Sequence, residues 1–146
     1  MVIRAAEVKD VEAIHSLIVA LAVYEKEPHA VINTPEKLSE DLFVHQRCFA
    51  LVAEDQNQTV GFALYFFGYS TWKGRTLYLE DLFVREESRK LGIGQDLFNA
   101  VLRVAKEEKV RRMDWQVLEW NTPAIAFYQK NKAYLDESWI NGRLFF

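Results

Sequence analysis

The sequence has few of the residues that cross-link chains or bind metals, and no segment that spans a membrane. It contains one cysteine, Cys48, so no disulfide can form within the chain. The histidines His15, His29 and His45 show no metal-ligand spacing with Cys48, and we expect no metal site. No apolar run approaches the roughly 20 residues that cross a bilayer, and the opening MVIRAAEVKD has no apolar signal core. We therefore expect a cytoplasmic protein that does not act in a membrane.

A surplus of positive charge is also absent. Lys and Arg number 18 against 21 Asp and Glu, which gives a net charge of -3. A nucleic-acid-binding domain ordinarily carries a basic patch that neutralises phosphates. The charge balance therefore argues against a nucleic-acid partner and favours a cationic one.

The residues that are present form the composition of a compact folded chain. Of the 146 residues, 50% are hydrophobic, 14% are aromatic and 27% are charged. A chain of this length buries roughly two thirds of its unfolded surface in one core and has no room for a second domain. We expect a single domain over residues 1–146.

The order of apolar patterns predicts an α+β fold. The expected strands are residues 2–5, 48–54, 59–67, 76–84 and 113–118, with a closing hairpin at Asn141-Gly142, and the expected helices are residues 8–24, 35–44, 92–108 and 121–130. The polar DQNQ joins two strands as a hairpin, and a loop is expected from Gly68 to Gly74. Hairpins combined with crossover helices predict a mixed β-sheet flanked by helices.

The stretch SRKLGIGQDLF, residues 88–98, combines a basic pair with two glycines between a strand and a helix. Helix N-termini have unpaired N–H groups and a positive dipole end, so the stretch can hold an anion. A dinucleotide fingerprint would need a third glycine where Leu97 stands, and the Gly-Lys-Ser/Thr of a P-loop is missing. A glycine-rich helix cap without a ligand is the alternative.

The remaining pattern, Arg89-x-x-Gly92-x-Gly94, resembles the GNAT superfamily of acyl-CoA-dependent N-acyltransferases. Four further segments extend the resemblance to diamine and polyamine acetyltransferases of the spermidine/spermine type and to thialysine acetyltransferases: YLEDLFV, EWNTPAIAFYQK, LAVYEKE and GFALYFF. The resemblance implies a GNAT-like mixed sheet, acetyl-CoA as cosubstrate and a homodimer. It also assigns residues to the cofactor, namely Leu82, Phe83, Val84, Arg89, Lys90, Leu91, Gly92, Ile93, Gly94, Gln95, Asn121, Thr122, Pro123 and Ala124.

The same resemblance implies an active site for acetyl transfer to an amine. It makes Glu80 the base that takes the proton of the amine, through water, and Tyr128 the acid that protonates the leaving thiolate. It places five further residues with Glu80 around the acceptor, namely Tyr24, Glu25, Asp114, Trp115 and Gln116. The residues alone also allow Glu80 to be a solvated strand carboxylate and Tyr128 a packing residue. In a regular strand Asp81 would face away from Glu80, because side chains alternate.

These observations predict an acetyl-CoA-dependent N-acetyltransferase that transfers acetyl directly to a small cationic primary amine, such as a diamine, a polyamine or thialysine. An alkylamine with a pKa near 10.4 is protonated at neutral pH, so such an enzyme must remove a proton. One alternative is acetylation of a protein lysine or another amine. Another is a CoA-binding regulatory module without turnover.

Overall fold

The computed structural model describes residues 1–146 and consists of two compact units, Met1–Trp115 and Gln116–Phe146. The first unit contains the whole β-sheet and most of the helical residues. The second contains one helix and the C-terminal segment.

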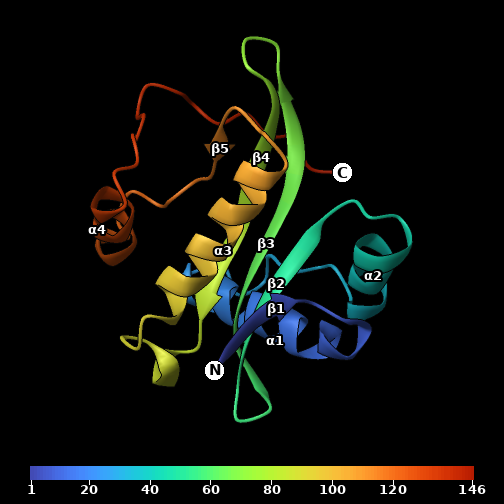
Figure 1. Cartoon of the computed structure of the whole chain (residues 1–146). Coiled ribbons are helices and arrows are strands. Elements are labelled where there is room, and N and C mark those ends of the chain that lie inside the picture. The colour runs from blue at the N-terminus through green and yellow to red at the C-terminus, as the bar shows by residue number, and fades with distance from the viewer. The chain divides into compact units, whose positions relative to one another are not determined.

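A mixed five-stranded sheet forms the centre of the first unit (Figure 1). The strands lie in chain order across the sheet: β1 Val2–Ala5, β2 Phe49–Asp55, β3 Gln58–Ser70, β4 Gly74–Val84 and β5 Met113–Asp114. Neighbours from β1 to β4 are antiparallel, whereas β5 runs parallel to β4. The predicted mixed sheet is confirmed.

The helices of this unit begin where the sequence places helix signals. They are α1 Val11–Tyr24, preceded by the 3-10 turn Val8–Asp10, then α2 Pro35–Ser39, continued by a π turn over Glu40–Val44, and α3 Ile93–Glu107, preceded by the 3-10 turn Glu86–Ser88. At the start of α2, the Thr34 hydroxyl accepts a hydrogen bond from the Lys37 N–H at 3.2 Å. None of the helices combines the length and apolar character that crossing a bilayer requires.

Helices cover both faces of the sheet. Ile14 and Leu17 of α1 share one core cluster with Val52 of β2 and Phe62 of β3. On the opposite face, a Cβ atom at Gly61 would lie 3.2 Å from Leu97 Cδ1 of α3, so this glycine allows the helix to approach closely. One face of the sheet thus packs against α1 and α2, and the other face packs against α3.

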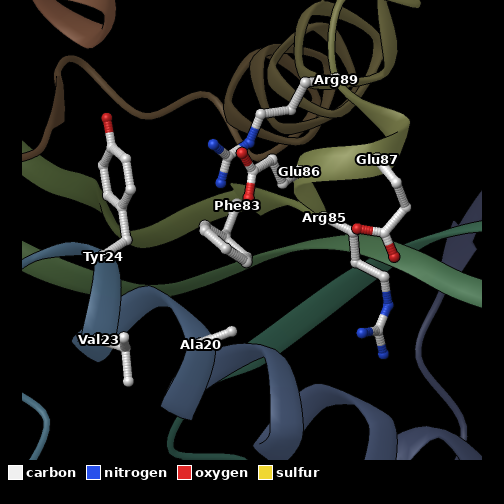
Figure 2. Close-up of a pocket in the computed structure, with 8 residues that line it drawn as sticks. All are labelled: Ala20, Val23, Tyr24, Phe83, Arg85, Glu86, Glu87 and Arg89. Atoms are coloured by element: carbon white, nitrogen blue, oxygen red, sulfur yellow. The ribbon is translucent and has the colours of Figure 1, made fainter.

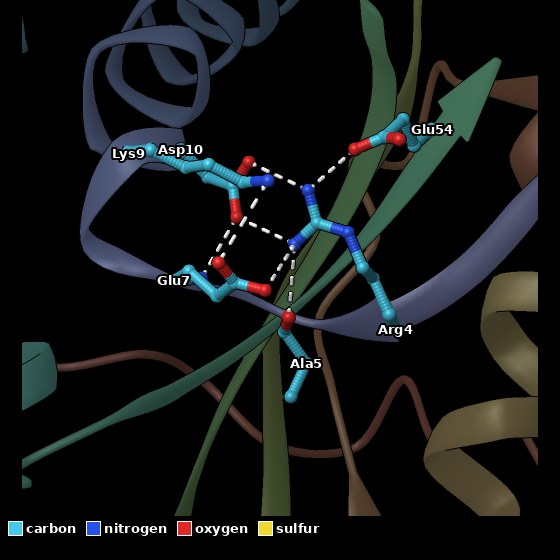
Figure 3. A network of polar contacts seen from close by, with 6 residues as sticks. All are labelled: Arg4, Ala5, Glu7, Lys9, Asp10 and Glu54. Atoms are coloured by element: carbon cyan, nitrogen blue, oxygen red, sulfur yellow. Dashed lines mark hydrogen bonds and ion pairs between the residues drawn. The ribbon is translucent and has the colours of Figure 1, made fainter. Parts of the chain in front are cut away.

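A polar network anchors the edge of the sheet near the N-terminus (Figure 3). The Arg4 guanidinium on β1 donates to both carboxylate oxygens of Asp10, at 2.7 and 2.9 Å, and to Glu54 on β2 at 2.6 Å. Asp10 also accepts the backbone N–H of Glu7 at 2.7 Å. This pairing lowers the pKa of Asp10 and fixes the turn that leads into α1.

The β-hairpins differ in part from the prediction. The DQNQ turn is confirmed, and Gln56 and Asn57 adopt φ values of 49° and 62°, as the turns that join twisted strands require. The second loop is shorter than expected, because β3 continues through Gly68 to Ser70 and pairs with β4 down to Gly74. The long β3–β4 hairpin projects beyond its neighbouring strands (Figure 1).

Two predicted strand regions at the end of the chain are wrong. β5 stops at Asp114, and the next residue, Trp115, instead packs edge-to-face on Phe98 of α3 with ring centroids 5.7 Å apart. The hairpin at Asn141-Gly142 does not form, and no strand follows α4. Alternating apolar residues form a strand where a face buries them, but Ile140 and Phe146 are 96% and 113% exposed.

The second unit is organised by α4, Thr122–Lys130. The Asn121 side chain accepts a hydrogen bond from the Ala124 N–H at 3.3 Å, and Pro123 occupies the first turn, where its missing N–H is no loss. Asn131 closes the other end by donating from Nδ2 to the Phe127 carbonyl at 2.9 Å. This helix begins and ends where its caps predict.

Candidate active site

The glycine motif forms a turn that opens directly into α3. Lys90 and Gly92 take left-handed conformations with φ of 66° and 81°, and Gly92 is the N-cap of the helix without a side-chain cap. The first backbone hydrogen bond of the helix runs from the Asp96 N–H to the Gly92 carbonyl at 3.0 Å. The N–H groups of the preceding turn have no intrahelical acceptor and lie at the positive end of the helix dipole. We call residues 89–95 the cradle.

The cradle is open to a ligand. A Cβ atom at Gly92 would meet no atom within 4 Å, and one at Gly94 would meet only Val84 Cγ2 at 3.8 Å. An anion can therefore approach this backbone, and the left-handed conformations of Lys90 and Gly92 can turn neighbouring N–H groups toward it. A donor set of this kind fits the pyrophosphate of coenzyme A.

The strand before the cradle has one unpaired edge. Leu82, Phe83 and Val84 pair with β3 on one side, whereas β5 pairs with β4 only at Leu77 and Tyr78. The other edge of β4 beyond Tyr78 therefore pairs with no strand. Backbone groups at such an edge can bind an extended ligand that carries amides, as the pantetheine arm does.

A β-bulge interrupts β4 at Glu80. Leu64 of β3 pairs with Asp81, but the next residue, Tyr65, pairs with Leu79, so Glu80 is the extra residue. Bulges redirect side chains, and the alternation that would set Glu80 and Asp81 on opposite faces fails here. Asp81 lies opposite Leu64, a core residue beneath α1, and so faces the α1 side of the sheet.

Three carboxylates interact electrostatically near this end of β4. Glu25 caps the C-terminus of α1, and burial together with the charge of Glu80 raises its pKa. Burial, followed by the charges of Glu80 and Glu25, raises the pKa of Asp81 to about 7. We call Glu25, Glu80 and Asp81 the carboxylate cluster. The three are not arranged to hold a metal ion, and no ion pair within 4.0 Å neutralises any of them.

A cavity of about 360 Å³ separates the end of α1 from the connection between β4 and α3 (Figure 2). Its volume is in the range of small-molecule sites. The lining residues are Ala20, Val23 and Tyr24 of α1, Phe83 of β4, and Arg85, Glu86, Glu87 and Arg89 of the connection. Tyr24 and Phe83 therefore lie where the predicted acceptor and cofactor regions meet.

The remaining predicted acceptor residues make contacts of their own. Asp114 is ion-paired with Arg112, whose Nε lies 2.9 Å from Oδ1. The Trp115 ring packs on α3, as described above. Gln116 opens the second unit and donates from Nε2 to Asn141 Oδ1 at 2.6 Å. Their contact with an acceptor stays a prediction.

The predicted residues of the second unit lie on α4. Asn121, Thr122, Pro123 and Ala124 form its start, and the Asn121 side chain is engaged as the cap. Tyr128 lies one turn further along and packs edge-to-face on Phe127, with ring centroids 5.3 Å apart. Their roles toward the cofactor stay predictions.

Asp81 is the member of the carboxylate cluster that the regular-strand expectation placed on the opposite face. Two adjacent carboxylates in an otherwise apolar strand, YLEDLFV, were the available signal. A regular strand would bury one of them and expose the other, so adjacency alone does not reveal a bulge that groups both with Glu25.

A helix start with unpaired N–H groups beside an open strand edge, in a mixed sheet of this order, is the arrangement expected of an acyl-CoA-dependent N-acetyltransferase. The chain belongs to the acetyltransferase (GNAT) family, whose model matches residues 11–133.

Similar proteins agree with this assignment. The chain is 38% identical over 138 residues to a thialysine N-epsilon-acetyltransferase of Bos taurus, covering 88% of this chain and 81% of the relative. It is 35% identical to the spermidine/spermine N(1)-acetyltransferase-like protein 1 of Homo sapiens over 90% of this chain and 20% of the relative. An aminoglycoside acetyltransferase from an uncultured soil metagenomic sample superposes with a TM-score of 0.82 at 20% identity, covering 99% of this chain and 95% of that one. This last likeness concerns the fold alone.

Proposed function

We propose that the protein transfers the acetyl group of acetyl-CoA directly to a small cationic primary amine, without an acyl-enzyme. The carboxylate cluster is the observation that carries this proposal. Its members have no ion-pair partner in the chain, and a bound ammonium would neutralise charge that now raises the pKa of Asp81. The thialysine and spermidine/spermine acetyltransferase relatives support an acceptor of this class.

The cluster also supplies groups that remove a proton. The attacking amine must be neutral, yet an alkylammonium ordinarily has a pKa near 10.4. We propose that exposed Glu80 accepts this proton through a water molecule. Asp81 has a pKa of about 7, so it can both accept and release a proton at neutral pH. An acid–base group works best when its pKa lies near the working pH. Glu25 would bind a second, distal ammonium.

The cofactor residues complete the proposal. The cradle would bind the pyrophosphate, Leu82, Phe83 and Val84 would bind the pantetheine arm through backbone groups, and residues 121–124 would lie along it. When bound, acetyl-CoA supplies the thioester whose acetyl group is transferred. Tyr128 would donate its phenolic proton to the leaving sulfur, since a phenol with a pKa near 10 is protonated at pH 7. Holding both reactants side by side removes much of the entropic barrier.

Kinetics of two variants test the acceptor. Glu25→Gln should lower kcat/KM for a diamine by roughly 5- to 150-fold, about 1 to 3 kcal/mol, and leave a monoamine of matched length much less affected. Glu80→Gln should slow both amines, and raising the pH should partly restore the rate by supplying neutral amine. Glu27→Gln, an exposed carboxylate two residues from Glu25, is the matched control. Equal losses for both amines in Glu25→Gln would favour an uncharged or protein acceptor.

We also propose that the enzyme is a cytoplasmic homodimer, as its family resemblance implies. Exposed apolar side chains in the second unit support an interface, among them Trp139, Ile140 and Leu144. The single, partly buried Cys48 supports a reducing compartment. Light scattering coupled to size-exclusion chromatography should give twice the chain mass of 17.1 kDa, and a mass of one chain would contradict the dimer.

A further inference from the structure

The guanidinium of Arg89 makes three contacts that do not involve a phosphate. Its Nε donates to the Val84 carbonyl at 2.9 Å. Its Cζ lies 5.2 Å from the ring centroid of Tyr24 and 5.2 Å from that of Phe83, within the range of a cation–π contact. Figure 2 shows Arg89 and Tyr24 reaching into the same cavity from the cradle and from α1. One side chain thus joins both sides of the site.

The contact between Arg89 and Tyr24 joins the predicted cofactor side of the site to the predicted acceptor side. Arg89 is the first residue of the cradle, whereas Tyr24 is the last residue of α1 and precedes Glu25 of the carboxylate cluster. Phe83 lies on the strand whose free edge leads to the cradle. A shift of the guanidinium therefore reaches the acceptor side through one ring contact.

The chemistry of arginine suits a bridge of this kind. The bond from Nε leaves the two Nη groups of the planar fork as donors for a phosphate, while its faces stay against the rings. Lysine has a point charge and no planar face, so it can replace the charge but not this combined geometry.

We propose that Arg89 is a positioning residue that couples the cradle to the acceptor side through Tyr24, so that coenzyme A and the amine bind cooperatively. This inference rests on the proposed function. A phosphate in the cradle orders the guanidinium, the ordered guanidinium holds the Tyr24 ring, and the end of α1 with Glu25 is then fixed for the ammonium. By reciprocity, the bound amine strengthens coenzyme A binding by the same factor.

Calorimetry of the non-reacting complex measures this coupling directly. Coenzyme A, which lacks an acetyl group, is titrated into the protein with and without a saturating diamine. In the wild-type protein we expect the diamine to raise coenzyme A affinity about 3- to 10-fold. Arg89→Lys and Tyr24→Leu should each reduce this factor to below about 2. Tyr24→Phe keeps the aromatic face and is the matched control, and it should keep the wild-type factor.

Steady-state kinetics give a second readout. In the wild-type protein the KM of the diamine should fall about 3- to 10-fold as acetyl-CoA rises from far below saturation to saturation, and in Arg89→Lys it should fall less than about twofold. In the double variant Arg89→Lys with Tyr24→Leu, the loss should be no greater than in either single variant, because both remove one contact.

The outcomes separate this inference from the proposed function. A wild-type protein that does not bind coenzyme A overturns both. A wild-type protein that binds coenzyme A with no effect of the diamine overturns the coupling alone. Variants that lose coenzyme A affinity tenfold but keep the wild-type coupling factor also overturn it, and make Arg89 an ordinary phosphate ligand.

Discussion

Replacing Asp81 by Asn should make the protein more stable at neutral pH, and the gain should depend on pH. In the unfolded chain the carboxyl ionises near 3.8, whereas in the fold its pKa is about 7. Between these values the folded state holds a proton that the unfolded state has lost, so stability falls as the pH rises. Three pKa units correspond to about 4 kcal/mol. Asn has nearly the same shape and no charge, so Asp81→Asn removes this penalty.

Urea unfolding followed by tryptophan fluorescence measures the effect. The difference in unfolding free energy between Asp81→Asn and the wild type should be small near pH 4, grow through pH 5 to 7 and level off above pH 7. Using the difference cancels the titration of other groups. Glu107→Gln, at an exposed carboxylate on α3, is the control and should show no such trend. A difference between Asp81→Asn and wild type that stays flat from pH 4 to 8 would refute the raised pKa.

The same substitution should lower activity while it raises stability. A carboxyl held near neutrality costs the fold free energy, and such groups are retained at sites where their chemistry is used. If Asp81→Asn is both more stable and fully active with a diamine at pH 7, Asp81 has no part in the proton transfer proposed above.

Three further substitutions test other parts of the molecule. Asp10→Asn should destabilise the fold by about 3 kcal/mol at pH 7, because it leaves Arg4 without its two-bond partner. Since pairing lowers the pKa of Asp10, this loss should shrink as the pH falls below 4, which urea unfolding at pH 3 and 7 can check. Gly92→Asp should abolish coenzyme A binding by calorimetry, since it sets a negative side chain within the cradle at a position with φ of 81°, and unchanged affinity in a folded variant would contradict the role of the cradle. Tyr128→Phe should lower kcat by roughly 10- to 10⁴-fold with coenzyme A affinity largely kept, and a near-normal kcat would reduce Tyr128 to packing.

Elements with local signals could be predicted from the sequence. Thr34 with Pro35 marks the start of α2 and Asn121 with Pro123 that of α4, and both caps form in the structure. The period of Leu97 and Val101 predicts the buried face of α3. These features depend on neighbours a few residues away, so the chain itself contains the information. The hairpin at Asn141-Gly142 shows the limit of such signals, because a strand also needs a partner and a face to bury it.

The carboxylate cluster, unlike these helix starts, depends on how β3 and β4 pair. Glu80 and Asp81 were visible as an acidic pair, and Glu25 as an acidic residue after an amphipathic helix. Bringing them together requires a bulge opposite Leu64 and Tyr65, and a register shift is set by pairing between strands rather than by either strand alone. The alternation of side chains along a regular strand therefore predicts the wrong face of the sheet for a residue that follows a β-bulge.

The two kinds of information explain why the sequence predicts the geometry of the cradle more directly than that of the carboxylate cluster. The cradle lies within a few residues around Gly92, where turn and helix start are encoded together, so its chemistry follows from a short motif. The acceptor side is assembled from α1 and from a bulged β4, and its charge environment exists only after folding, as the raised pKa values of Glu25 and Asp81 show. Under the proposed function, a change of acceptor needs only substitutions at the end of α1 and at the bulge, whereas the cradle must keep the geometry that binds coenzyme A. We infer that amine preference is determined mainly at these two places, and that Arg89, which touches both the cradle side and Tyr24, constrains how far they can change independently.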